Sequence, residues 1–174
     1  AREEETYSMY SKRVMKLMRE EFDQLRNEHE KSKFWFPKIM QNYVLKGPVL
    51  EWYVRVKYKL EAKNFEKYDA LIHNASKIYD VGCGYGYLSY YLHYRNRNRE
   101  IIGLDYDEEK VLTAQHGVKK NENLQFEIAD VRNVEFTSAD AIFLNDVLHY
   151  LPKEDQMLVL QNCANALTNN GILF

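Results

Sequence analysis

From Lys77 to the end of the chain, short apolar runs alternate with longer segments of helical periodicity, and this alternation constrains the fold most. Such alternation is typical of parallel strands joined by crossover helices. The sequence therefore predicts an α/β fold with a doubly wound, mostly parallel sheet. The predicted strands are 77–81, 100–105, 124–128, 140–145 and 171–174, and the predicted helices are 87–94, 107–116 and 153–167. Asn169, Asn170 and Gly171 should close the last of these helices.

The first 75 residues have a different pattern and predict a helical extension or lid (1–75) ahead of the core (76–174). No Pro or Gly interrupts residues 3–30, where apolar residues recur at helical spacing, so a long amphipathic helix is expected there. We expect a short helix and turns over 31–48. A helix beginning at Pro48 should run to Ala62, and a further short helix should follow from Asn64 to His73.

Charge and cysteine content exclude several classes of protein. The 24 basic and 26 acidic residues give a net charge of −2, which does not favour a nucleic-acid partner. Two cysteines are too few for a disulfide framework, and no apolar run approaches the ~20 residues that span a bilayer. We expect a cytoplasmic protein without a metal site. The chain begins with Ala, which indicates either processing or, as we favour, a fragment of something longer. The last predicted strand leaves an edge open, so we expect either that the sheet is truncated there or that a dimer partner or fused domain covers the edge.

A glycine-rich turn follows the first predicted strand. Gly82, Gly84 and Gly86 let the backbone approach a ligand where any Cβ would collide. Backbone N–H groups at the start of the next helix then face that ligand. Glycine turns also occur for packing alone, so the interpretation depends on the acidic residues downstream.

Two carboxylates follow the next strands at the spacing of a nucleoside site. Asp105 ends the second strand, where an acidic side chain can accept from both ribose hydroxyls. Asp130 follows the third strand and can accept from the exocyclic amine of adenine, while the Val131 N–H can donate to the ring. The alternatives are a helix cap for Asp105, for which Asp107 is better placed, and a turn role for Asp130.

These segments resemble the successive motifs of class I S-adenosylmethionine-dependent methyltransferases over about residues 76–174. The matching segments are 78–86 (IYDVGCGYG), 103–105 (GLD), 129–131 (ADV) and 140–149 (DAIFLNDVLH). The resemblance implies a Rossmann-like fold, C-terminally incomplete here, that binds S-adenosyl-L-methionine. It assigns the methionine part to Asp80 and the turn through Gly82, Cys83, Gly84 and Gly86, the ribose to Asp105, the adenine to Tyr106, Asp130 and Val131, and the ammonium to the Asn145 carbonyl.

The competing cofactor is a nicotinamide dinucleotide, which would make the chain an oxidoreductase. Its fingerprint is G-x-G-x-x-G, whereas this turn reads G-x-G-x-G with Asp80 two residues ahead of it. A carboxylate there suits an ammonium or sulfonium better than a pyrophosphate. The pattern therefore favours the methyl donor.

Methyl transfer depends mainly on positioning, and a general base is needed only if the acceptor carries a proton. His149, just beyond the fourth predicted strand, is the candidate base, with a packing or capping role as the alternative. Segments 46–48, 53–57, 82–86, 103–110 and 146–151 are similar to methyltransferase domains at the end of bacterial acyltransferase-methyltransferase fusions. That similarity implies a small or lipid-linked acceptor.

Aromatic residues stand among basic ones over 31–59, for example Trp52 and Tyr53 beside Arg55. Such a segment suits a lid over the cofactor or peripheral contact with an anionic lipid surface. The rival to an enzyme is a non-catalytic module that binds the cofactor or packs against a neighbouring domain of a larger fusion protein.

Overall fold

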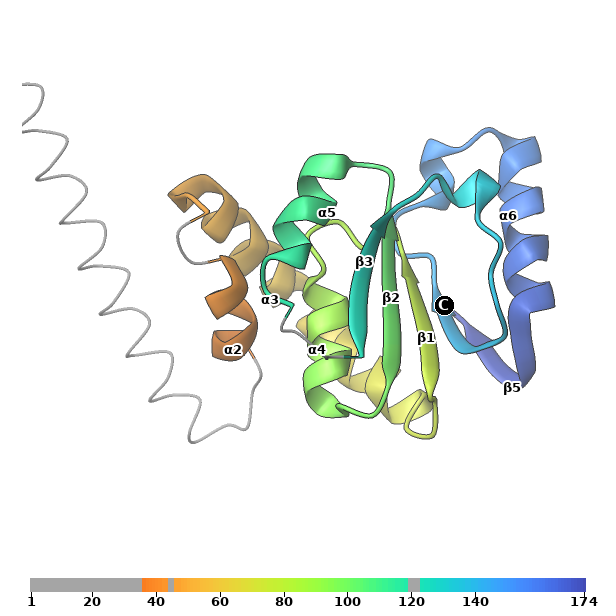
Figure 1. The fold of residues 1–174 in the computed structure, drawn as a ribbon, viewed down its shortest axis with the longest axis horizontal. Helices are drawn as coiled ribbons and strands as arrows, with labels where there is room; N and C mark the ends of the chain where they lie inside the picture. The colour runs from red at the N-terminus through yellow and green to blue at the C-terminus, as the bar shows by residue number, and fades with distance from the viewer. Residues whose placement is uncertain (1–35, 44–45, 119–122) are drawn as a thin grey trace, which may run out of the picture. The chain divides into compact units, whose positions relative to one another are not determined.

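A computed structural model of the chain describes residues 36–43, 46–118 and 123–174 (Figure 1). The helix predicted over 3–30 therefore lies outside the described residues. The chain divides into two compact units, residues 1–38 and 39–174, and apart from residues 36–38 the features described below belong to the second. The boundary predicted at residue 75 stays a prediction.

Five parallel strands form one sheet in the order β3-β2-β1-β4-β5, which confirms the predicted doubly wound fold. The strands are β1 (Lys77–Val81), β2 (Glu100–Asp105), β3 (Leu124–Ile128), β4 (Ala139–Phe143) and β5 (Leu167–Leu173). The first three have the predicted bounds, because each is a short buried apolar run bounded by polar or glycine residues.

The last strand begins earlier than predicted. In the β4–β5 pairing Ala139 lies opposite Leu167 and Ala141 opposite Ile172, so residues 168–171 form an irregularity within β5. Asn169, Asn170 and Gly171 were expected to close the preceding helix. The chain instead passes directly from that helix into the strand, and the polar residues lie in the irregularity.

Helices cover both faces of the sheet. The helices that the described residues form are α2 (Phe36–Met40), α3 (Pro48–Leu71), α4 (Tyr87–Arg95), α5 (Glu108–Gln115) and α6 (Lys153–Ala166), with short 3-10 turns η1 (Gln41–Tyr43), η2 (Val131–Asn133) and η3 (Leu148–Tyr150). Figure 1 shows α3, α4 and α5 on one side of the sheet and α6 on the other. This two-sided cover is what buries both faces of a parallel sheet.

The prediction of two helices over 48–73 was wrong, because α3 is one continuous helix. No Pro or Gly interrupts it after Pro48. Val54, Tyr58, Phe65 and Asp69 are all buried on it and lie at helical spacing. Continuous packing of this one face outweighs the weak local signal for a break near Asn64.

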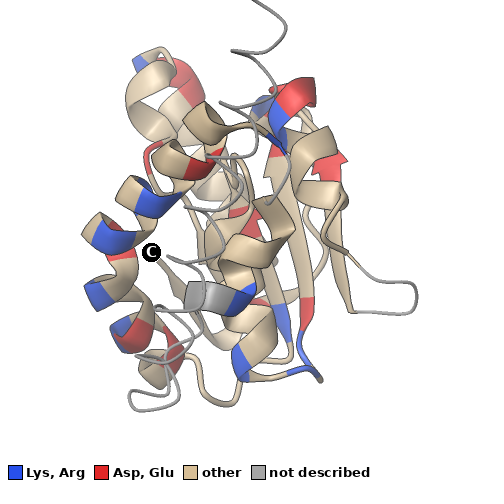
Figure 2. Cartoon of the chain, turned by 90° about the vertical axis from the view of Figure 1, so that its left-hand side faces the viewer, with Lys and Arg blue, Asp and Glu red and all other residues tan. Residues whose placement is uncertain are grey.

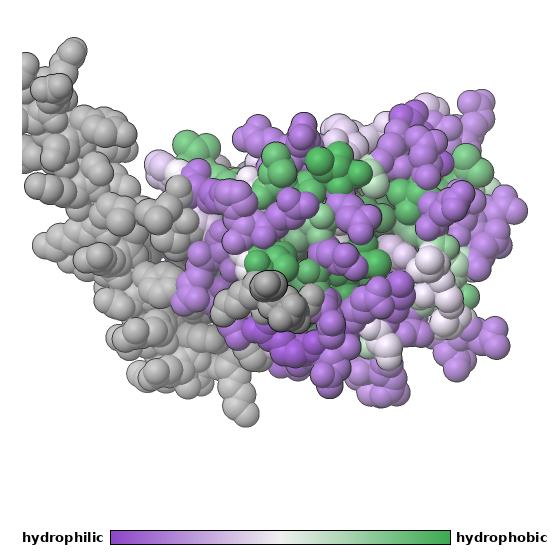
Figure 3. All heavy atoms as spheres, in the orientation of Figure 1, coloured by the Kyte–Doolittle hydropathy of each residue, from purple (hydrophilic) through white to green (hydrophobic). Residues whose placement is uncertain are grey.

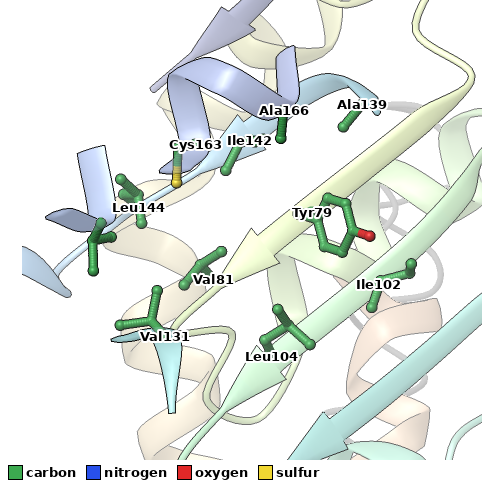
Figure 4. Close-up of a cluster of buried hydrophobic side chains, with 11 residues drawn as sticks. Tyr79, Val81, Ile102, Leu104, Val131, Ala139, Ile142, Leu144, Cys163 and Ala166 are labelled. Carbon is green, nitrogen blue, oxygen red and sulfur yellow. The ribbon is translucent and has the colours of Figure 1, made fainter. Parts of the chain in front are cut away.

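The core beneath α6 gathers apolar side chains from β1, β2 and β4 on one face of the sheet (Figure 4). Its members on the strands include Tyr79, Val81 and Leu104, and those on α6 include Cys163 and Ala166. On the opposite face aromatic rings do the packing: the Tyr68 ring of α3 lies 5.2 Å from that of Phe143. The central strands are therefore fixed from both sides.

A buried ion pair fixes the C-terminal end of α3. Asp69 accepts from the Arg99 guanidinium at 2.6 Å and from Arg95 Nε at 2.8 Å, and Arg99 also donates to the carbonyl oxygen of Ile72 at 3.1 Å. Because both buried charges have partners, their desolvation cost is offset. The pair therefore sets where α3 crosses the sheet.

The surface in the view of Figure 1 mixes hydrophilic side chains with smaller apolar areas (Figure 3). Ile128, on the edge strand β3, and Leu112, on α5, are about half exposed. Among the described residues no helix is long and apolar enough to cross a membrane.

Candidate functional site

The strand order predicts a ligand crevice at the carboxyl ends of β1 and β4. From β1 the chain proceeds outward to β2 and β3, and it returns to the other side of β1 with β4. Ligands of open α/β sheets bind outside the strand ends at such a switch point. Gly82 follows β1 here and Asn145 follows β4, and the Asn145 carbonyl oxygen lies 3.6 Å from where a Cβ on Gly82 would stand.

The glycines of the turn serve two different purposes. Both Gly82, with φ 73°, and Gly84, with φ 53°, adopt the left-handed backbone that favours glycine. A Cβ on Gly82 would lie 2.2 Å from Val147 Cγ2, so this glycine permits close approach of the two turns. A Cβ on Gly84 would meet nothing within 4 Å. The space above Gly84 is therefore open to a ligand.

Asp105 holds this turn in place from the end of β2. Its Oδ2 accepts from the Gly84 backbone N–H at 2.8 Å, and its Oδ1 accepts from the Asp107 N–H at 2.9 Å. Asp107 caps α5 by accepting from the Lys110 N–H at 3.3 Å, so the cap alternative for Asp105 is wrong. A carboxylate has about four acceptor positions, and Asp105 keeps capacity for two hydroxyl donors.

Asp80 is a buried carboxyl that forms no ion pair with any residue the structure describes. Its only described side-chain partner is the Ser89 hydroxyl, which donates to it at 2.6 Å. Burial raises the pKa of Asp80 to about 6, the Ser89 bonds oppose this rise, and the negative charges of Glu61 and Asp105 add to it. A cation placed here would relieve an electrostatic cost that the protein alone does not offset.

Helix α3 contributes residues that the sequence did not single out. Glu61 accepts from the Tyr87 hydroxyl at 3.2 Å, and Lys57 Nζ lies 3.3 Å from Glu61 and 3.7 Å from Asp146. The i, i+4 spacing of Lys57 and Glu61 places them on one helix face, but no sequence signal shows that this face meets the crevice. The class I motifs that assign cofactor contacts begin at β1, and the similarity over 53–57 assigned no role to Lys57.

Asp146 carries backbone strain at the mouth of the crevice. It follows Asn145 in the turn after β4 and has φ 56°, which is uncommon for a residue other than glycine. Its side chain is exposed and lies near Lys57. Strain of this kind clusters at ligand sites, where surrounding contacts hold it. The ion pair of Asp146 with Lys57 therefore connects the turn after β4 to helix α3.

The residues assigned to adenine lie beyond β2 and β3. Tyr106 follows Asp105 and is 76% exposed, so its ring is accessible to a ligand. Asp130 accepts from the Arg132 backbone N–H at 3.0 Å and from Arg132 Nε at 2.9 Å, and this guanidinium holds the pKa of Asp130 below its usual range. An adenine amine would share Asp130 with Arg132. Val131 is buried at the start of η2, and both assignments stay predictions.

The remaining predicted residues differ in how they face the crevice. The Cys83 thiol is buried beneath the turn, and burial raises its pKa, so only its backbone is placed to face a ligand. Gly86 has left-handed backbone at the start of α4. His149 is exposed on η3 with its ring 3.9 Å from that of Tyr150, and its catalytic role stays a prediction. The described residues contain no cluster of three or more metal ligands.

Comparisons with known proteins agree with this geometry. A family model described as a methyltransferase domain matches residues 78–171. A carboxy-S-adenosyl-L-methionine synthase of Glaesserella parasuis is 33% identical over 103 residues, which cover 56% of this chain and 43% of that protein. The chain thus spans less than half the length of this curated relative.

Two solved structures share the fold. An amino pentose methyltransferase from Micromonospora echinaspora, solved with S-adenosylmethionine bound, superposes with a TM-score of 0.58 at 19% identity, over 73% of this chain and 55% of that one. Human N-acetylserotonin methyltransferase superposes with a TM-score of 0.57 at 20% identity, over 75% of this chain and 38% of that one.

We predict that Asp80→Asn stabilises the protein at neutral pH. Because the folded pKa of Asp80 is raised above the unfolded value of about 3.9, its stabilising contribution is present below pH ~4 and is lost as the pH rises through about 6. At pH 7.5 the free energy of unfolding of the variant should exceed that of the unaltered protein by on the order of 2 kcal/mol. Below pH 4 the difference should vanish, as measured by urea unfolding across the pH range.

Asp140→Asn is the matched control, and we expect it to change the free energy of unfolding in the opposite direction. Asp140 accepts from the Ser76 and Lys77 backbone N–H groups at 2.8 and 3.1 Å, and these bonds hold its pKa below the usual range. That stabilisation is present above the unfolded pKa and is lost as the pH falls through the folded pKa. The control should therefore be destabilised at pH 7.5. Destabilisation of both variants at that pH would contradict the account of Asp80.

Proposed function

Because the chain belongs to the family of methyltransferase domains, we propose that it binds S-adenosyl-L-methionine in the crevice between β1 and β4 and transfers a methyl group to an acceptor. The observation that carries this proposal is the buried Asp80 carboxyl, whose pKa is raised to about 6 by burial and by neighbouring negative charge, together with the open space above Gly84. A ligand carrying both an ammonium and a sulfonium would supply positive charge beside this carboxyl.

The neighbouring groups suit the amino-acid end of this ligand. The Asn145 carbonyl, close to Gly82, is an acceptor for an ammonium. Glu61 adds a second carboxylate near Asp80, since its charge raises the pKa of Asp80. If these two carboxylates and the carbonyl converge on the bound ligand, as we propose, they would favour a cation there.

The nucleoside end would lie toward β2 and β3. Asp105 keeps two acceptor positions for the ribose hydroxyls while it holds Gly84 and Asp107. The exposed Tyr106 ring would cover one face of the adenine, and Asp130 with the Val131 N–H would read its edge. A pyrophosphate would instead bring negative charge against Asp80, which argues against a dinucleotide.

Catalysis by this chain would consist mainly of positioning. When bound, the cofactor would supply a methyl group whose carbon an acceptor can attack while the bond to the positively charged sulfur breaks and the thioether leaves. Glu61, Asp80 and Asp105 would fix that carbon relative to the acceptor, and such fixing supplies much of the rate. His149, exposed on η3, would take a proton from an acceptor that carries one.

The acceptor we propose is small or lipid-linked, as the similarity to acyltransferase-methyltransferase fusions implies. The curated relatives favour a second candidate, because they are named for synthesis of carboxy-S-adenosyl-L-methionine. The two reactions differ in product. The protein should be incubated with methyl-tritiated adenosylmethionine and cell extract. Tritium in an acceptor would support methyl transfer, whereas a nucleoside product heavier by the mass of a carboxyl group would support the second candidate. If neither product forms, both candidates are contradicted.

We predict that Gly84→Ala removes nucleoside binding while the fold is kept. The new methyl group would enter the open space above the turn and would collide with the ligand rather than with the protein. Left-handed backbone costs a non-glycine residue about 1–2 kcal/mol. By calorimetry, affinity for S-adenosylhomocysteine should fall by at least about tenfold, since a loss of only ~1.4 kcal/mol has that effect.

Gly47→Ala is the control for strain. Gly47 has φ 105°, and a Cβ there would also meet nothing within 4 Å, but it precedes α3 rather than facing the crevice. Its affinity should match that of the unaltered protein. If both variants bind equally well, the space above Gly84 is not the ligand site.

We predict that Glu61→Gln weakens recognition of the amino-acid end alone. Loss of one charge-assisted contact should lower affinity for S-adenosylhomocysteine by about tenfold. Affinity for methylthioadenosine, which has the nucleoside but no amino-acid end, should stay unchanged. Calorimetry with both ligands makes the comparison.

Glu66→Gln serves as the control, because Glu66 is an exposed carboxylate on the same helix. It should leave both affinities unchanged. Equal losses for the two ligands in Glu61→Gln would mean that Glu61 acts only through the Tyr87 contact, and the assignment to the ammonium would be wrong.

A further inference from the structure

Helix α3 exposes a row of apolar side chains on the face turned away from the sheet. Val49, Trp52, Val56 and Leu60 are 78%, 63%, 36% and 71% exposed. Their spacing of three or four residues places them on one helix face, and we call these four residues the apolar stripe. The buried side chains of the same helix, such as Tyr58 and Phe65, lie on the opposite face. No packing within the described residues accounts for the stripe.

Lysines continue this outward face along the helix. Lys63 and Lys67 follow Leu60 at helical spacing, Lys59 lies beside them, and all three are exposed. Figure 2 shows basic positions recurring on successive turns of α3, on the left of that view. Single exposed apolar residues are common, but an apolar row that leads into a basic row is the pattern of a helix lying on a membrane surface.

The acidic residues of α3 do not neutralise this row. Glu51 pairs with Arg55 at 2.9 Å, Glu61 contacts Lys57, and Asp69 pairs with Arg99. Of the acidic residues on α3, only Glu66 is exposed. The outward face therefore presents three lysines against one glutamate, which complements an anionic surface.

We propose that this face of α3 lies on an anionic lipid surface. The apolar stripe would enter the boundary between headgroups and acyl chains, and Lys59, Lys63 and Lys67 would contact the phosphates. A second copy of the chain fits less well, because parallel helices would oppose their lysines and antiparallel helices would place lysines against the apolar stripe.

The proposal does not depend on the methyltransferase function, but it would place the crevice beside the lipid. Tyr53 is partly exposed next to the stripe, and its ring lies 5.7 Å from that of Tyr85 in the glycine turn. Lys57 and Glu61 occupy the flank of α3 that faces the crevice. A lipid-linked acceptor would then reach the site along Tyr53.

The test uses the full chain with Trp35→Phe, so that Trp52 is the only tryptophan. Sucrose-loaded vesicles of phosphatidylcholine alone, or with about one third phosphatidylglycerol, are sedimented with the protein. We expect binding to the anionic vesicles with a blue shift of Trp52 fluorescence, weakened in high salt because the lysine contacts are screened. Lys63→Gln and Lys67→Gln should each reduce binding about fivefold.

Matched variants separate the stripe from general surface apolarity. Val49→Ser with Leu60→Ser should lower vesicle binding by at least about tenfold, since two apolar side chains lose burial. Met157→Ser with Leu158→Ser, at exposed apolar positions on α6, should not change it. Both variants should keep the unfolding temperature and the affinity for S-adenosylhomocysteine, so failure of this proposal is distinct from failure of the proposed function.

Three outcomes would overturn the proposal. Equal binding to both vesicle types without a salt effect would remove the role of the lysines. Trp52 already shielded from acrylamide in a monomer without vesicles would mean that the chain itself covers the stripe. A concentration-dependent dimer in sedimentation velocity, lost in the Val49→Ser and Leu60→Ser variant, would identify a second copy as the occupant.

Discussion

The site depends on one carboxylate, Asp105, that binds two backbone N–H groups at once. By accepting from Gly84 and from Asp107 it connects the turn after β1 to the start of the helix after β2. The first turn is fixed further by the N–H groups of Gly82 and Cys83, which donate to the Leu104 carbonyl oxygen at 2.7 and 3.0 Å. Preorganisation of this kind means that a ligand meets a formed surface and does not bear the entropic cost of ordering the loops.

The pKa values of two aspartates in the same sheet are shifted in opposite directions. Asp140, on β4 beside the start of β1, accepts from backbone N–H groups, so its charge is stabilised and its pKa is lowered. Asp80, near the carboxyl end of β1, is buried beside further negative charge, and its pKa is raised. Native structures tolerate such an unfavourable buried charge chiefly at functional sites, where a bound ligand can supply the opposite charge. The contrast supports the site proposed at the carboxyl ends of the strands, whereas Asp140 contributes stability at their opposite ends.

The sequence allowed good prediction wherever the signal was local. The strands through Tyr79, Ile102 and Phe126 and the cap at Asp107 were predicted at their observed positions, because apolar runs and capping residues act over a few neighbours. The break in α3 and the start of the last strand were wrong, because packing decided them. Lys57 and Glu61 were missed for the same reason: their role depends on which face of a helix meets the crevice, and helical periodicity does not specify that.

One helix can serve several purposes because its faces point in different directions. On α3, Tyr58 and Phe65 are buried against the fold, whereas Lys57 and Glu61 lie about a quarter of a turn or less away, since successive residues differ by about 100°. The apolar stripe lies on the remaining side. A role of this segment as a lid over the cofactor is therefore compatible with contact to a lipid surface. The flank of α3 that carries Glu61 faces the crevice, and the outward face stays available to lipid. A helix fixed at its end by the buried pair of Asp69 with Arg99 would transmit surface contact to the crevice as a rigid element.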